Sequence, residues 1–303
     1  MSGATPIRVR SLEESLRAAT GAIRDDLIRV GEGDCAWVSG STFDGLGHGT
    51  SDVDVFVATP EIRPSLPVTR RHAGFAVHAF IDAHTRFDVE YWALPAIAQL
   101  GEKLASMRLE DPDVNLVNYF SKWETDFIHR LFIGVPLADA AAVDRLRASF
   151  ARDRLARYLY DTALHFYDNA FDDCVGMLEA GQLECAAIQA RSLAGYAVDA
   201  LTAACGVTNG QEKFRPERLR RLLRERGGDE RVFADYWAVE VGMPDATEAL
   251  ASYIRGTLAY AERLLAVVQD AVAARRQAHG DKRDCLLEEI PAGLVGAAAA
   301  PRR

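Results

Sequence analysis

The stretch that decides the fold is residues 38–55, VSGSTFDGLGHGTSDVDV, which begins with a Gly-Ser turn and ends in an Asp-Val-Asp run. Residues two apart in a strand point to the same face, so Asp52 and Asp54 are expected to project together while the valines face a core. Two like charges held side by side are unfavourable unless a cation neutralises them. Because Mg²⁺ prefers hard oxygen ligands, the run predicts a metal site on a strand.

The turn before the acidic run predicts a phosphate contact. Gly40 and Ser41 supply backbone N–H groups and a hydroxyl, which are the natural partners of a triphosphate. Together with Ser51, they are the predicted nucleotide-binding residues. A lone Gly-Ser pair is usually an ordinary turn, and a lone Asp-x-Asp strand is more often a solvated edge. Their combination at this spacing favours a functional site.

The order of these residues resembles a known signature. Gly40-Ser41, ten residues, then Asp52-Val53-Asp54 is similar to the signature of the DNA polymerase beta-like nucleotidyltransferases. The spacing resembles that of the kanamycin-type aminoglycoside nucleotidyltransferases in particular. The resemblance is specific over residues 35–92. It implies a small catalytic domain with a helical partner domain behind it.

The family pattern also requires a third carboxylate on a later strand, and residues 86–92, RFDVEYW, offer two. Asp88 and Glu90 are again two apart, hence on one face of a strand. Both are flanked by apolar residues, as the pattern requires. Asp88 is favoured because the order Arg-apolar-Asp-apolar resembles the polymerase version more closely. Glu90 stays open as the alternative.

The resemblance implies metal-assisted transfer of a nucleoside monophosphate, with AMP expected, from an NTP to a hydroxyl. Asp52 and Asp54 would hold one Mg²⁺ on the triphosphate, and Asp88 or Glu90 would help to bind a second beside the acceptor. Both metals would stabilise charge on the attacking and leaving oxygens as pyrophosphate departs. Either acid of the later strand is a candidate to accept the acceptor's proton. Asp52, Asp54, Asp88 and Glu90 are therefore the predicted catalytic residues, and the first three are the predicted metal ligands.

Length and pattern predict an α+β protein of two domains, since 303 residues exceed the size of one usual core. A mixed-sheet catalytic domain is expected over 1–140, an up-and-down helical bundle over 141–279 and a disordered tail over 280–303. Apolar periodicity predicts helices over 11–30, 95–107, 119–132, 183–205 and 247–276, and strands over 35–38, 52–58, 75–81 and 87–92.

Composition narrows the class of partner. A net charge of −9 repels polyanions, which argues against a polymerase or RNA-modifying protein but not against binding of one nucleotide. The chain shows neither a signal peptide nor an apolar run long enough to span a bilayer, which predicts a cytoplasmic location. A small-molecule acceptor with cationic amines suits the acidic balance. The alternative is an antitoxin-like or regulatory module that acts on or binds a protein.

Two smaller expectations concern the bundle. The five cysteines lack Cys-x-x-Cys spacing, which predicts reduced thiols, and Cys174, Cys185 and Cys205 are expected to pack as small hydrophobic residues. The apolar bundle is also expected to bury a face against a second copy, giving a homodimer.

Overall fold

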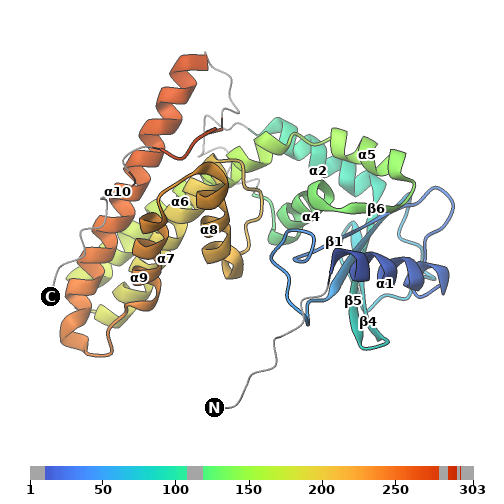
Figure 1. Cartoon of the computed structure of the whole chain (residues 1–303), viewed down its shortest axis with the longest axis horizontal. Coiled ribbons are helices and arrows are strands. Elements are labelled where there is room, and N and C mark those ends of the chain that lie inside the picture. The colour runs from blue at the N-terminus through green and yellow to red at the C-terminus, as the bar shows by residue number, and fades with distance from the viewer. Residues whose placement is uncertain (1–10, 108–118, 280–285, 292–293, 295–303) are drawn as a thin grey trace. The chain divides into compact units, whose positions relative to one another are not determined.

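The computed structural model describes residues 11–107, 119–279, 286–291 and 294. The chain forms two compact units, Met1–Ser106 with Phe120–Ala151 and Met107–Tyr119 with Arg152–Arg303. The first unit contains a mixed sheet with helices, and the second is helical (Figure 1). This arrangement confirms the predicted α+β class.

A six-stranded sheet forms the first unit, in the order β3-β4-β5-β2-β1-β6. Only the central pair β2–β5 is parallel, and every other neighbouring pair is antiparallel. The parallel register sets Asp54 opposite Asp88, which places the predicted acids of two strands side by side. The strands are β1 (Cys35–Ser39), β2 (Val53–Thr59), β3 (Arg70–Arg71), β4 (Phe75–Asp82), β5 (Thr85–Ala93) and β6 (Val135–Ala138).

The two faces of the sheet differ in chemistry. Alternate residues of β2 and β5, such as Val55 and Val89, join a buried cluster with helix α1 (Leu12–Arg24). The opposite face carries aromatic rings that pack on Phe127 of helix α4 (Lys122–Ile133), and it also carries Asp54 and Asp88. Side chains alternate along a strand, so the valines and the acids separate cleanly onto the two faces.

Capping residues start two of these helices. Ser11 Oγ accepts from the Glu14 N–H at 3.1 Å while Glu14 accepts from the Ser11 N–H at 2.9 Å, so the two residues form a capping box at the start of α1. The helix ends at Arg24 and not at residue 30, because Asp26 takes a left-handed conformation with φ 57°. An equivalent box at Ser121 starts α4.

Several details differ from the predicted elements. Strand β2 begins at Val53, so Asp52 lies directly before the strand and not within it. The edge strand β6 was not predicted from sequence, because it is short and contains a proline. It pairs with β1, and α5 (Ala140–Ala148) also packs on β1, which is why the first unit extends to Ala151 although a boundary near residue 140 was expected.

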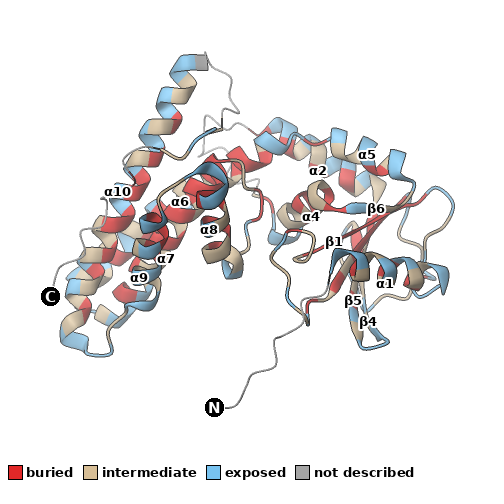
Figure 2. Ribbon diagram, viewed as in Figure 1, coloured by how far each residue is buried: buried red, intermediate tan, exposed pale blue. Residues whose placement is uncertain are grey.

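The second unit is built around α7 (Leu183–Ala204), whose small side chains are mostly buried. Its neighbours α6 (Arg152–Glu179) and α10 (Thr247–His279) pack against it, and α8 (Arg215–Arg226) and α9 (Glu230–Val241) complete the unit. Figure 2 shows the buried stripes of these helices. Within residues 11–107 and 119–279, no helix combines the length and apolar character needed to cross a bilayer.

The cysteine prediction is correct for two of its three residues. Cys174 and Cys205 are buried, but Cys185 is exposed because it lies on the outer side of the first turn of α7. All four described cysteines carry free thiols, and Cys285 lies outside the described residues.

The end of the chain departs in part from the expected disordered tail. Most of 280–303 lies outside the described residues, but Leu287, Ile290 and Leu294 pack into the hydrophobic core of the second unit. The Leu287 N–H donates to the carbonyl of Ala204 at 2.7 Å, and the Leu287 side chain is buried. The segment is held because it satisfies a carbonyl at the end of α7 that has no partner within the helix.

Candidate active site

Three aspartates form the centre of the candidate site. One carboxylate oxygen each from Asp52, Asp54 and Asp88 lies within 4.8 Å of the others, and all three residues are partly buried. The parallel register of β2 and β5 supplies two of the acids, and the residue just before β2 supplies the third. In the part of the chain that the structure describes, no other group of acids, histidines and cysteines meets this criterion.

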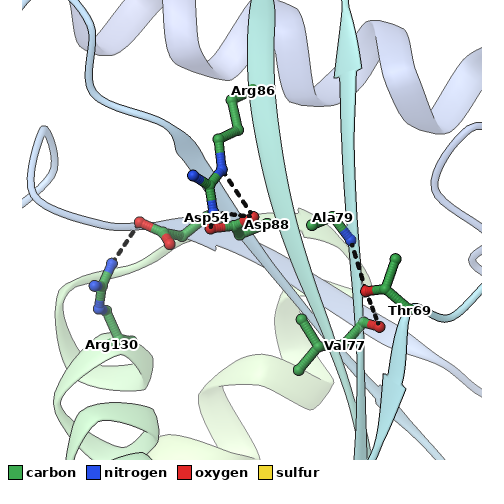
Figure 3. Close-up of polar contacts among 7 residues, drawn as sticks. All are labelled: Asp54, Thr69, Val77, Ala79, Arg86, Asp88 and Arg130. Carbon is green, nitrogen blue, oxygen red and sulfur yellow. Dashed lines mark hydrogen bonds and ion pairs between the residues drawn. The ribbon is translucent and has the colours of Figure 1, made fainter.

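Two arginines face these acids (Figure 3). Arg130 Nη1 lies 2.6 Å from Asp54 Oδ2, and Arg86 Nη2 lies 2.9 Å from Asp88 Oδ2. Arg130 is largely buried, with 13% of its side chain exposed, whereas Arg86 is 61% exposed. Three carboxylates against two guanidinium groups leave the cluster negative when all the acids are ionised.

Burial and crowding set the protonation of the acids. Burial raises the pKa of Asp54 to about 6; Arg130 opposes this, and the nearby charge of Asp52 adds to it. Burial also raises the pKa of Asp88, while the hydrogen bond and charge of Arg86 oppose it. Desolvation and like charges disfavour the ionised form, and a bound cation would reverse both effects.

The turn after β1 is shaped around this cluster. Gly40 has φ +111°, and a Cβ atom there would collide with Asp54 Oδ2 and press on Arg130 Nη1. The carbonyl of Gly40 accepts from the Phe43 and Asp44 N–H groups at 3.0 and 3.1 Å, so hydrogen bonds within the turn set its shape. Only glycine permits both this conformation and this close approach.

The predicted nucleotide-binding serines lie together at the two ends of the loop. Ser41 Oγ lies 3.3 Å from Ser51 Oγ, and Ser51 Oγ accepts from the His48 N–H at 2.8 Å. Ser51 is buried and directly precedes Asp52. The loop therefore returns to its starting point and sets hydroxyl groups beside the acids.

Glu90 lies on the same face but outside the group of three. Its carboxylate accepts from Trp92 Nε1 at 2.7 Å, and burial raises its pKa to about 8. The acid is therefore largely neutral near pH 7 in the metal-free site. The structure brings Asp88, and not Glu90, within reach of both other aspartates.

Sequence reasoning missed the contributions of α4. Arg130 meets Asp54 across 76 residues of chain, and His129 Nε2 lies 3.4 Å from Asp44 Oδ2. Neither contact leaves a short-range motif. One signal in the sequence could have identified Arg130. It lies three residues after Phe127, on the apolar side of the helix predicted over 119–132, and a charge buried there requires a partner.

The residues of the cluster fit a hard divalent cation. They offer carboxylate oxygens only, and they carry excess negative charge in a partly buried place, which Mg²⁺ or Mn²⁺ would neutralise. The site is distinct from a pocket of about 460 Å³ elsewhere in the first unit, whose lining includes Phe75, Trp92 and Lys103 but none of the three aspartates.

Comparison with known proteins adds little beyond this geometry. No protein-family model and no curated protein matches the chain. Among solved structures, the chain is similar to a nucleotidyltransferase-like protein from Exiguobacterium sibiricum 255-15, with 16% identity over 86% of this chain and 80% of that chain. The TM-score is 0.44.

Proposed function

We propose that the protein is a Mg²⁺-dependent nucleotidyltransferase that moves a nucleoside monophosphate from an NTP to a hydroxyl of a small-molecule acceptor and releases pyrophosphate. The observation that carries this proposal is the group of Asp52, Asp54 and Asp88 beside the turn at Gly40. A phosphate-compatible turn and a carboxylate cluster on neighbouring strands are the parts that this reaction needs.

Each residue has a role that its position supports. Asp52 and Asp54 would hold the metal, and Asp88 would complete its carboxylate set. Bound Mg²⁺ supplies positive charge to the phosphate oxygens and lowers the cost of the negative charge that develops there. Ser41 and Ser51 would donate their hydroxyl groups to the outer phosphates, because these two oxygens lie 3.3 Å apart where the two ends of the loop meet.

Asp88 is also the better candidate to accept the acceptor's proton. Its side chain is 25% exposed, and its strand neighbour Glu90 bonds to Trp92 instead. An acceptor hydroxyl must approach the base within hydrogen-bond distance, which the more exposed carboxylate permits. We further propose ATP as the donor and an acceptor that carries cationic amines, since the protein has a net charge of −9.

The test is pyrophosphate release with each NTP, Mg²⁺ and a panel of amine-bearing alcohols. Asp54→Asn and Asp88→Asn are expected to lower release at least about a hundredfold, as expected for loss of the main charge stabilisation. The matched control is Asp82→Asn, an exposed acid at the end of β4 in the same unit, which should retain activity. Equal release by the wild type and Asp54→Asn would contradict the proposal.

A further inference from the structure

Two consecutive residues of α4 contact two different parts of the candidate site. We propose that His129 and Arg130 are positioning residues, which hold the nucleotide-binding turn and the metal-binding carboxylates in one alignment. This inference rests on the proposed function, and it assigns separate tasks to the neighbours. Arg130 orients Asp54 for the metal, and His129 orients the turn through Asp44.

The Arg130 contact is specific in geometry. Nη1 donates to Asp54 Oδ2 at 2.6 Å, and Nη2 lies 3.9 Å from Asp126 Oδ2 one helical turn earlier. The guanidinium thus engages one oxygen of Asp54 from the helix side, on the sheet face where Asp54 neighbours Asp88 (Figure 3). A partner that holds the outer oxygen of a ligating carboxylate fixes the direction of the other oxygen.

The His129 contact reaches the turn. His129 Nε2 lies 3.4 Å from Asp44 Oδ2, and the two side chains are only 5% and 8% exposed. Asp44 belongs to the turn itself, because its N–H donates to the carbonyl of Gly40. A buried polar contact costs desolvation and is kept where it specifies a geometry. The 3.4 Å approach of His129 to Asp44 places these two buried side chains between the turn and α4.

Helix α4 is firmly anchored, which a positioning element requires. Phe127 is fully buried, with its ring centroid 5.8 Å from that of Trp37 and 4.3 Å from that of Trp92. Ser39 Oγ, at the end of β1, donates to the carbonyl of Arg130 at 3.0 Å. Ser39, the last residue before the turn, therefore bonds to Arg130, the same residue of α4 that contacts Asp54.

The two tasks predict different defects. Arg130→Gln should weaken Mn²⁺ binding in the absence of nucleotide about tenfold or more, the usual effect of losing a partner of a metal ligand, and Arg130→Lys should restore part of it. His129→Gln and Asp44→Asn should leave Mn²⁺ affinity within about threefold and raise the dissociation constant of a fluorescent ATP analogue about tenfold. If α4 acted only as a scaffold, the variants would lose affinity for Mn²⁺ and for the ATP analogue together.

The experiment measures both affinities for each full-length variant, together with pyrophosphate release and thermal unfolding. The matched control is Arg63→Gln. It breaks another arginine–aspartate pair of the first unit, in which Arg63 lies 2.5 Å from the buried Asp34. Arg63 follows the C-terminal end of β2, whereas Asp54 lies near its start. That variant should lose stability without a change in either affinity.

Besides a shared defect, three outcomes would overturn the inference. The first is unchanged Mn²⁺ affinity in Arg130→Gln while the wild type binds metal and releases pyrophosphate; this outcome leaves the proposed function intact. The second is tighter Mn²⁺ binding by that variant, which would mean that Arg130 competes with the metal. The third is a wild type that binds neither Mn²⁺ nor nucleotide, and it removes the proposed function as well.

Discussion

At the scale of single residues, Gly40 is the position where the backbone and the site constrain each other most. Its φ of +111° and its contact with Asp54 and Arg130 leave no space for a side chain. Gly40→Ala should lower the free energy of unfolding by about 1–3 kcal/mol, the cost of one strained backbone position, and should weaken metal binding because Asp54 must move. Urea unfolding and Mn²⁺ titration measure the two effects.

Gly21 provides the control for that substitution. It lies within α1 of the same unit, and nothing approaches within 4 Å of the position a Cβ would take. Gly21→Ala should stabilise the protein by up to about 1 kcal/mol, because alanine is the better helix former. A Gly40→Ala variant that matched Gly21→Ala in stability and metal affinity would show that the turn is not shaped as described.

The raised pKa of Asp54 predicts how metal binding depends on pH. Protons and the metal compete for the ionised carboxylate, and burial raises its pKa in the metal-free protein to about 6. Affinity should therefore be nearly constant above pH 7 and fall toward tenfold per pH unit below pH 6. Mn²⁺ titrations between pH 5 and 8 measure this, and a carboxylate with an ordinary pKa would shift the fall below pH 4.

At the scale of elements, the segment after α10 stabilises the end of α7. Leu287 is buried, and Arg226 donates to its carbonyl at 3.2 Å and to that of Cys205 at 3.1 Å. Leu287→Ala should cost about 2–4 kcal/mol of unfolding free energy, as is usual for a buried leucine. The comparison variant Glu289→Ala, at an exposed position, should match the wild type in the same urea titration. Equal stabilities of the two variants would refute the contact.

Elements also show where local pattern suffices and where it does not. Strand β2, predicted over 52–58 and observed over 53–59, and helix α1 could be predicted because alternation and helical periodicity act over a few residues. The pairing of β6 with β1 was not predicted, because its four residues carry no alternation of their own. Such a strand forms only when a neighbouring edge offers hydrogen bonds.

At the scale of the whole molecule, the acidic balance predicts weak binding to nucleic-acid polymers. The net charge is −9. Arginines of the basic helix α8 are paired with acidic residues, as in Arg224 with Glu217 at 3.2 Å. A single-stranded RNA should bind more weakly than about 10⁻⁴ M at physiological salt, the weak limit for non-specific binders. Fluorescence anisotropy tests this; micromolar binding that strengthens steeply at low salt would contradict it.

The sequence by itself determined the parts that depend on near neighbours. The spacing of Asp52 and Asp54, the acidic strand with Asp88, and the helical second half can be read from periods of 2 and 3.6 residues. The glycine at position 40 was also identified, although only as a phosphate contact. These features depend on interactions between residues that are close in sequence, so they can be predicted without the tertiary structure.

Only the tertiary structure decided which distant groups meet. It set Asp88 opposite Asp54 and placed Glu90 against Trp92, whereas the sequence favoured Asp88 only by its flanking residues and left Glu90 open. It also brought Arg130 to Asp54 across 76 residues. Such contacts depend on how whole elements pack and on the free-energy cost of burying a charge without a partner. A short stretch of sequence determines neither of these.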